Sequence, residues 1–462
     1  MKKRKMAVLV FILLLVSCNH QETSSLTSSS FSTSSLSSLK QEGDNLVIYY
    51  PSSANFRNIF EKTSPLFKED QGNGAILLNN GLQSSFRSIS DEDSYYSTID
   101  GILSSNASLS SNDKIDMFLV SENYLLKYMA SGYAVNLLNL GFQETNFASQ
   151  YSFARQEAIS SKNEYLASGF QLNPGLFAYR RDLAQTIFGT SSPEDIQAKV
   201  ASWDDFTAAA QTVEDKGYLM LSGFGDSLDP FLDGISAPLV SADKVNFDDS
   251  LENWVTQTKD FTSNGFNNST EYESTNWILD QGPSSQVFSF FLSSSQSANL
   301  VINSLSNLDG EQKLGNGLYG QWGLCQGPSL YRRDNMYLLA ATGGDNNSAV
   351  KEIIREMTMD SKIMKSIASM FRLAVNNEAV MDSFTANDVN PMYQQSDLAL
   401  YAEVNKKSKV RKGTIYDARI RDLLLHNSGF KNYFLGKITE EEAKTKFYNA
   451  LKQTYPSLTV PS

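Results

Sequence analysis

The side chains best suited to catalysis or metal binding are scarce in this chain of 462 residues. Its only histidines are His20 and His426, and its only cysteines are Cys18 and Cys325. Two histidines cannot supply a zinc site with several imidazole ligands, and a Ser-His-Asp triad could use only His426. The Gly-x-Ser-x-Gly and Gly-x-x-x-x-Gly-Lys patterns are both absent. We therefore expect no enzyme, no catalytic residues, no metal and no cofactor.

Carboxylate chemistry stays open, because the chain holds 51 Asp and Glu residues. Two carboxylates on either side of a glycosidic bond can hydrolyse it, and such pairing in space is invisible in a sequence. Asp91-Glu92-Asp93 lacks the spaced pattern of a calcium loop, so a solvated helix start is expected there. A surface glycoside hydrolase with paired carboxylates is thus an alternative function.

The N-terminus predicts export and covalent lipid attachment at Cys18. Basic residues Lys2–Lys5 precede an apolar run from Met6 to Val16, which is shorter than the roughly twenty residues that span a bilayer. The run therefore predicts a cleavable signal peptide over 1–17. Leu15-Val16-Ser17-Cys18 resembles the bacterial lipobox, in which the cysteine is lipidated and becomes the new N-terminus. An ordinary secretory signal that contains a cysteine is the alternative.

Composition predicts a flexible tether followed by a folded, acidic body. The Ser-rich range 18–43 follows the signal and cannot bury enough surface to order itself. The whole chain has 41% hydrophobic and 11% aromatic residues, which is a folded composition apart from the N-terminus, and its length favours two or three domains. A net charge of −12 argues against nucleic-acid binding. Cys325 has no disulfide partner if Cys18 is lipidated, and we expect it to be buried in a strand.

Strands and helices are expected to alternate along the body. The expected strands are 46–50, 75–78, 115–120 and 175–179. Helices are expected over 56–67 with an interruption at Pro65, over 95–103 and from Glu122. Helix starts are expected at Ser192-Pro193, at Ser202-Trp203 and at Thr439, whose capping box ends at Glu442. This alternation predicts an α/β protein with parallel sheets.

Several stretches between residues 44 and 460 resemble the extracellular solute-binding proteins of ABC importers, specifically family 1, whose members mostly take carbohydrates. Glu164–Leu183 resembles the segment in which the family's chain crosses between lobes. Ser202–Phe206 resembles a family helix start, and Asp116–Val120 with Ala130–Tyr133 resembles the third strand and its helix. Tyr433–Ala443 resembles the C-terminal helix pair.

The resemblance implies a two-lobe fold of two parallel-type sheets flanked by helices, with a hinge and an interlobe cleft. Lobe I would comprise 44–165 and about 300–355, and lobe II about 166–299 and 356–462. The protein would be a monomeric receptor, held by lipid at the extracytoplasmic face of a bacterial cell membrane. It would bind a small solute of the sugar or oligosaccharide class and deliver it to the membrane permease. It would bind no nucleic acid and need no cofactor.

The positions matched to the family give candidate ligand contacts at strand ends and at the lobe crossings. These residues are Tyr49, Tyr50, Ser53, Ser121, Asn123, Gln171, Asn173, Tyr331, Asn335 and Tyr416. The lipidation site is Cys18.

Two departures from the family pattern bear on the ligand. After Gly327-Pro328 the chain has Arg332-Arg333 where relatives often carry a Gly-Gly pair and an aromatic residue, and the family's tryptophan after 288–292 is absent. Trp254 and Trp277 are expected in the core. An anionic ligand group met by Arg332 or Arg333 is one hypothesis. A two-lobe surface protein that has lost ligand binding is another.

Overall fold

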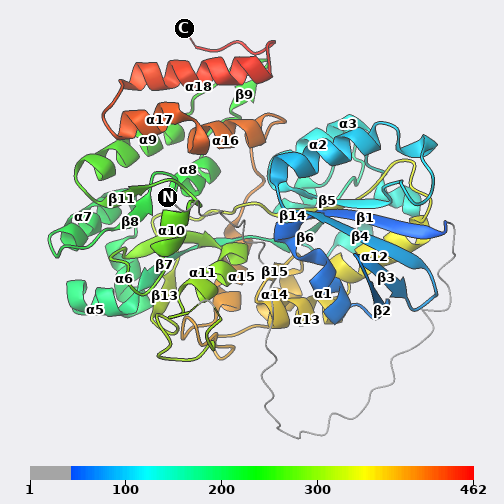
Figure 1. Ribbon diagram of the computed structural model, residues 1–462, viewed down its shortest axis with the longest axis horizontal. Helices are drawn as coiled ribbons and strands as arrows, with labels where there is room; N and C mark the ends of the chain where they lie inside the picture. The colour runs from blue at the N-terminus through cyan, green and yellow to red at the C-terminus, as the bar shows by residue number, and fades with distance from the viewer. Residues whose placement is uncertain (1–42, 308, 462) are drawn as a thin grey trace, which may run out of the picture. The chain divides into compact units, whose positions relative to one another are not determined.

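The structure is a computed structural model that describes residues 43–307 and 309–461 (Figure 1). The predicted signal peptide 1–17, Cys18 and all of the predicted tether except Gly43 lie outside the described residues. Within the described ranges, no helix combines the length and the apolar character needed to cross a membrane.

The larger of the two main sheets has eight strands in the order β15-β6-β14-β5-β1-β4-β3-β2. Central strand β1 pairs in parallel with β4 and β5, and the other neighbouring strands pair antiparallel. The strands are β1 Asn45–Pro51, β2 Phe67–Gly72, β3 Ala75–Leu78, β4 Gln83–Ile89, β5 Met117–Ser121, β6 Ser168–Leu172, β14 Met336–Ala340 and β15 Ala374–Val375. Alternation of strands and helices is therefore confirmed, but uniformly parallel pairing is not.

The antiparallel edge of this sheet results from a tight hairpin that the sequence prediction missed. Asn73 and Gly74 join β2 to β3, and both have positive φ, at 49° and 83°. A two-residue loop with positive φ at both positions matches the twist of antiparallel strands, and Asn-Gly is its preferred sequence. This turn reverses the chain where a helical crossover would be needed for a parallel pair.

Helices cover both faces of the large sheet. Figure 1 shows α2 and α3 on one side of it and α1 and α13 on the other. Helix α1 ends at Thr63, just before Pro65, and buries Phe56, Ile59 and Phe60 as predicted. The helices of this lobe are α1 Phe56–Thr63, α2 Glu92–Leu103, α3 Glu122–Ser131, α4 Ser152–Glu157, α12 Asn347–Thr358, α13 Ser361–Phe371 and α14 Glu378–Asp382, with short 3-10 turns at Ser52–Ala54, Asn106–Ser108, Leu137–Leu140 and Glu144–Phe147.

The second lobe is built on the antiparallel sheet β12-β7-β13 and on smaller strand pairs. Its strands are β7 Gly175–Arg180, β12 Ser289–Ser293 and β13 Trp322–Cys325, the parallel pair β8 Leu221–Gly223 and β11 Asn267–Thr270, and the hairpin β9 Val240–Ser241 and β10 Lys244–Val245. Cys325 is buried in β13 as expected, and burial raises the pKa of its thiol to about 12.

Helices surround this second sheet, and their starts confirm three predicted caps. The side chains of Ser192, Ser202 and Thr439 each accept a backbone hydrogen bond at a helix start, and Glu442 completes the capping box of α18. The helices are α5 Arg181–Phe188, α6 Pro193–Lys199, α7 Trp203–Glu214, α8 Leu228–Asp233, α9 Asp249–Ser263, α10 Thr275–Leu279, α11 Ser294–Asn303, α15 Asp397–Lys407, α16 Asp417–His426, α17 Ser428–Phe434 and α18 Glu440–Thr454.

The two lobes are joined by chain segments that lie side by side. One crossing follows β6 at Asn173-Pro174, and another precedes β14 at Tyr331–Asn335. Gly175 N donates to the carbonyl oxygen of Tyr331 at 2.9 Å, and Arg333 N donates to that of Asn173 at 2.9 Å. The two crossings thus form a short antiparallel ladder, which fixes where the chain changes lobes.

The strand pairing places the boundaries between the two lobes at other residues than those predicted. β6 and β15 belong to the large sheet, although they fall in the ranges predicted for lobe II. β13 pairs with β7, although it falls in the range predicted for lobe I. The first two crossings come after β6 and after β13, so each of these strands still pairs within the lobe that the chain is leaving. β15 follows β14 along the chain and stays in the same large sheet.

The second lobe contains both tryptophans that were expected in the core. Trp254 is fully buried and meets the ring of Phe434 edge-on, with centroids 5.5 Å apart. Trp277 is 5% exposed and donates from Nε1 to Asp226 at 2.5 Å. Both side chains therefore pack in the fold and are absent from the cavity described below.

A buried glutamate predicts how the stability depends on pH. Glu356 in α12 is 2% exposed, and burial raises its pKa from the usual 4.5 to about 7, although a hydrogen bond from Ser64 opposes this. The unfolded chain releases this proton near pH 4.5 and the folded chain near pH 7, so the stability falls as the pH rises between these values. Glu356→Gln should therefore raise the free energy of unfolding at pH 8 by roughly 3 kcal/mol relative to wild type, and hardly change it at pH 4.

Urea unfolding at both pH values measures this effect, and Glu403→Gln is the matched control because Glu403 is exposed. An equal change at pH 4 and pH 8 would contradict the assignment, because the variant would then act through packing.

Candidate ligand-binding site

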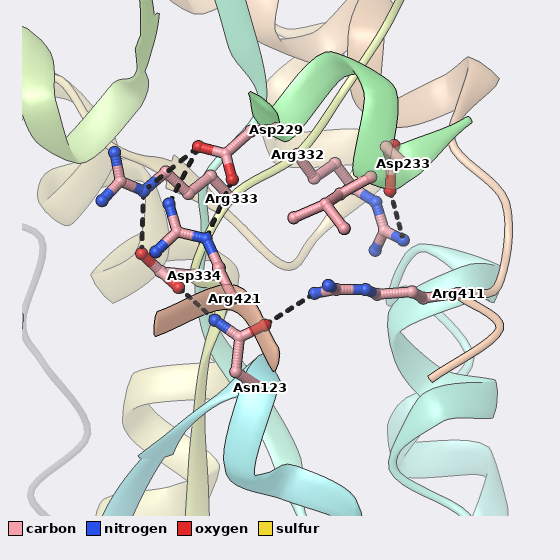
Figure 2. Close-up of a pocket in the computed structure, with 9 residues that line it drawn as sticks. Asn123, Asp229, Asp233, Arg332, Arg333, Asp334, Arg411 and Arg421 are labelled. Carbon is pink, nitrogen blue, oxygen red and sulfur yellow. Dashed lines mark hydrogen bonds and ion pairs between the residues drawn. The ribbon is translucent and has the colours of Figure 1, made fainter. Parts of the chain in front are cut away.

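A cavity lies where residues of both lobes and of a crossing segment meet (Figure 2). It holds about 210 Å³ of space between protein atoms, a figure that includes open solvent, so the enclosed part is far smaller than the 300 Å³ or more that is usual for ligand pockets. Charged side chains dominate its wall, and Leu232 is its one apolar side chain. The lining residues are Asn123, Asp229, Leu232, Asp233, Arg332, Arg333, Asp334, Arg411 and Arg421.

Four structural elements position these side chains. Asn123 lies in the first turn of α3, immediately after the carboxyl end of β5, the edge at which open α/β sheets usually bind ligands. Asp229 and Asp233 lie four residues apart on α8, which places them on neighbouring turns of one helix face. The crossing segment supplies Arg332–Asp334, and α16 with the preceding loop supplies the remaining two arginines.

One half of the cavity wall is a network centred on Arg333 and Arg421. Arg421 binds Asp229 through two parallel hydrogen bonds, Nε to Oδ1 at 3.0 Å and Nη2 to Oδ2 at 3.1 Å. Arg333 donates from Nε to Asp334 at 3.0 Å and from Nη2 to Glu273 at 2.9 Å. Charge-assisted bonds of this kind hold both guanidinium groups in fixed orientations.

The other half is a network centred on Arg332 and Arg411. Arg332 binds both carboxylate oxygens of Glu157, at 3.1 and 3.3 Å. Arg411 donates from Nη1 to Glu122 at 3.0 Å and to Asn123 at 2.9 Å, the latter bond being visible in Figure 2. The Arg332 bonds join α4 to the crossing segment, and the Arg411 bonds join α3 to the chain that leads into α16.

The pKa shifts in the cavity follow from burial and from this pairing. Burial lowers the pKa of the Arg332 guanidinium, but Glu122 and Glu157 more than compensate and raise it. Burial would raise the pKa of Asp334, yet Arg421 and Arg333 hold it below its usual value. Both groups are therefore charged at neutral pH.

The pairing bears on the hypothesis of an anionic ligand. Arg332 and Arg333 already bind the carboxylates of Glu157, Asp334 and Glu273. At Arg332 an anionic group would have to displace Glu157, whose side chain is 9% exposed, and a buried carboxylate left unpaired costs several kcal/mol. The geometry therefore disfavours an anionic group at Arg332.

Asn123 is the one predicted contact that lines the cavity. Of the three predicted residues at the end of β1, Tyr49 receives a hydrogen bond from Arg87 at 3.0 Å. Tyr50 is 5% exposed and packs its ring beside Phe56, whereas Ser53 is exposed. The structure does not bring these three side chains to the cavity.

The predicted amide contacts lie buried at the crossings. Asn173 N donates to Asn335 Oδ1 at 2.7 Å, and Asn173 Nδ2 donates to the carbonyl oxygen of Asp334 at 2.6 Å. Gln171 donates to the side chain of Asn173 at 3.3 Å. These bonds tie the two crossing segments together, so the amides connect the lobes in this structure.

Three further predicted contacts pack against protein atoms. Ser121 bonds with Tyr96, whose hydroxyl lies 3.2 Å from the Ser121 hydroxyl. Tyr331 is 1% exposed and donates to the carbonyl oxygen of Leu176 at 3.3 Å. Tyr416 is half-buried and meets the ring of Tyr455 edge-on. A role for these residues in ligand binding stays a prediction.

The sequence prediction missed Leu232 and five charged residues of the cavity wall, which are Asp229, Asp233, Asp334, Arg411 and Arg421. Charged residues on helices and loops are usually solvated, so nothing in their local pattern marked them. The available signal was Arg332-Arg333-Asp334, three charged residues between two apolar strands, which requires buried partners of opposite charge.

The described residues contain no group of three or more His, Cys, Asp or Glu side chains arranged to hold a metal ion. The carboxylates in the cavity wall instead face guanidinium groups, which already supply the positive charge that a metal ion would bring. The expectation of no metal and no cofactor stays a prediction.

Comparison with known proteins identifies relatives by structure alone. No family model matches the chain, and no curated protein matches it in sequence. An extracellular solute-binding protein of family 1 superposes with a TM-score of 0.70 at 12% identity, over 88% of this chain and 99% of that one.

Two further similar structures are described with their ligands. One is an ABC-transporter-associated binding protein from B. animalis subsp. lactis Bl-04 in complex with beta-1,6-galactobiose, with a TM-score of 0.64 at 12% identity, over 91% of this chain and 100% of that one. The other is the GacH receptor of Streptomyces glaucescens GLA.O, solved unliganded and with acarbose, with a TM-score of 0.63 at 13% identity, over 91% and 100% of the two chains. The chain therefore has the two-lobe α/β fold of the extracellular solute-binding proteins of ABC transporters.

Proposed function

We propose that this protein is the lipid-anchored substrate-binding receptor of an ABC importer, which captures a sugar or oligosaccharide and delivers it to the permease. It acts as a monomer at the extracytoplasmic face of the bacterial cell membrane, held there through Cys18, and it performs no chemistry on its ligand. The observation that carries this proposal is a cavity walled by both lobes and a crossing segment in a fold shared with sugar-binding receptors.

The cavity is suited to capture by lobe closure. Arg411 and its partners Glu122 and Asn123 come from different lobes, so a ligand that bonds with these side chains contacts both lobes at once. A ligand shifts a conformational equilibrium only through a difference in its affinity for the two states. Contacts from both lobes exist only when the lobes are together, and they supply that difference.

A thermal-shift screen of the full chain against mono- and oligosaccharides, amino acids and peptides tests the proposal. At a ligand concentration one hundred times its Kd, binding adds about 2.7 kcal/mol to the stability. We expect one or more carbohydrates to raise the melting temperature without forming a product. Amino acids and peptides serve as controls of similar polarity and are expected to leave it unchanged.

The two alternatives predict other outcomes of the same screen. A glycoside hydrolase would release shortened sugars, which chromatography of the mixture would detect. The small volume of the cavity favours a second candidate, a two-lobe surface protein without a ligand, which would show no shift with any compound.

A further inference from the structure

The space between the two lobes is filled by side chains of the protein itself. The cavity in Figure 2 leaves room for about one water molecule, whereas ligand pockets usually offer about 300 Å³ or more. The bonds around it join protein groups to one another. Closure of the lobes is therefore completed by the protein alone, and a solute can enter only after the lobes have moved apart.

Arg411 joins the two lobes directly. It lies in the segment that leads into α16 of the second lobe, and its Nη1 donates to Glu122 at 3.0 Å and to Asn123 at 2.9 Å in the first lobe. Its backbone N–H donates to Glu157 of the first lobe at 2.8 Å. The side chains of Arg411 and Glu122 are 12% and 4% exposed, so solvent ions screen their attraction little.

The segment that carries Arg411 is fixed to the second lobe. Lys412 donates from Nζ to the carbonyl oxygen of Ser236. The backbone N–H of Thr414 donates at 3.0 Å to Asp417, the first residue of α16. Helix α16 in turn contacts α18 within the second lobe and α3 of the first lobe. When the lobes move apart, this segment moves with the second lobe, and the bonds from Arg411 to α3 break.

Other ion pairs of the cavity wall do not depend on closure in this way. Arg421 and Asp229 both belong to the second lobe, and Arg332 joins the second crossing to Glu157 of α4. These pairs can persist when the lobes separate. The pair of Arg411 with Glu122 therefore distinguishes the closed form from an open one.

The charge of Arg411 also lies between carboxylates of opposite lobes. Burial lowers the pKa of the Arg411 guanidinium, but Glu122 of the first lobe and Asp417 and Asp233 of the second together more than compensate and raise it. Like charges repel each other strongly where water is scarce. Without the positive charge of Arg411, these carboxylates would thus favour separated lobes.

We propose that Arg411 is a latch that keeps the lobes closed without a solute, and that the receptor opens only when the Arg411 bonds to Glu122 and Asn123 break. Opening returns these groups to water, so the latch is reversible. A solute that enters the open form alone has its apparent affinity reduced by the open fraction, so about one open molecule in a hundred would weaken binding about a hundredfold. This inference rests on the proposed function and adds a regulatory step to it.

Electron paramagnetic resonance can measure the opening without any solute. Spin labels at Ser97→Cys in α2 and Thr445→Cys in α18 report the distance between the lobes, because both positions are exposed and lie on different lobes. The full chain carries Cys18→Ser, and the buried Cys325 stays unlabelled. We expect about nine molecules in ten or more at the short distance of the closed form.

Two variants of the latch should populate the open form. Arg411→Gln leaves the buried Glu122 without its guanidinium, a cost that only the closed form carries. Asn123→Ala removes the neutral acceptor, and alanine suits the first turn of α3, so this variant should fold normally. We expect the ratio of open to closed molecules to rise at least about tenfold in the first variant and less in the second. Arg419→Gln is the matched control and should leave the distance unchanged, because Arg419 pairs with Asp422 within α16.

A wild-type protein that shows mainly the long distance would overturn the proposal, because no latch would then hold the lobes. An unchanged distance in both latch variants would also overturn it, since other contacts would then keep the lobes closed. If Arg411→Gln does not fold, Asn123→Ala decides alone. None of these results bears on the receptor function, which would fail only if the carbohydrate screen gave no thermal shift.

Discussion

Arg332→Met is expected to lower the free energy of unfolding by about 3–5 kcal/mol, the usual cost of removing one partner of a buried ion pair. The Arg332 side chain is 1% exposed and that of Glu157 is 9% exposed. Glu157 would keep the Tyr337 hydroxyl at 2.7 Å and the Arg411 backbone N–H at 2.8 Å. Two neutral donors do not replace the lost positive charge.

The choice of methionine separates loss of charge from loss of packing. The Arg332 guanidinium lies 4.2 Å from the ring centroid of Phe153, and methionine retains an unbranched side chain that packs against this ring. The double variant Arg332→Met with Glu157→Gln removes both charges and should recover much of the stability. Urea unfolding of the two single variants and the double variant gives their coupling energy. If the stability losses of the two single variants add up in the double variant, the attraction between Arg332 and Glu157 contributes nothing to the stability.

Local sequence signals were sufficient to predict many of the elements. The capping box from Thr439 to Glu442 spans only four residues, and α18 begins there as predicted. The buried strand at 46–50 and the interruption of the first helix before Pro65 likewise follow from neighbouring residues. Strand direction depends on connections, so the pairing of β2 with β3 was missed although Asn73-Gly74 is a local turn signal.

The candidate site was much less predictable than the fold, because it is built from contacts between distant residues. Arg421 binds Asp229 across 192 positions, and Arg411 binds Glu122 across 289. Hydrophobic periodicity reports which face of an element is buried, but not which charged residues meet. Asn123 was predicted because it follows a strand end, and the residues that surround it come from elements whose placement depends on the whole fold.

Those long-range pairs also explain why the cavity is small and polar. Each arginine lies against one or more carboxylates, so protein side chains occupy much of the space that the wall encloses. A ligand of this cavity would therefore gain affinity through hydrogen bonds and ion pairs with polar atoms of the wall, rather than by filling an apolar volume. Specificity in such a site follows from charge and hydrogen bonding.

Gly175→Ala is expected to destabilise the protein by about 3 kcal/mol, the upper end of the usual cost of overpacking. A Cβ atom on Gly175 would lie 2.0 Å from Cζ of Tyr331, far inside contact distance. The Tyr331 ring cannot easily move away, because it is 1% exposed and meets the ring of Phe291 edge-on. Relief would instead require the crossing ladder between Gly175 N and Tyr331 O to open.

The same substitution elsewhere and a second variant isolate this contact. Gly101→Ala places a methyl group in α2 with nothing within 4 Å, so it should raise the stability by about 0.5–1 kcal/mol through helix propensity. Tyr331→Ala costs about 3–5 kcal/mol by itself, but Gly175→Ala should cost little in its presence. Urea unfolding of the four proteins measures this coupling. If Gly175→Ala costs as much without the tyrosine ring as with it, the loss comes from the backbone, and the two crossings are not held by this contact.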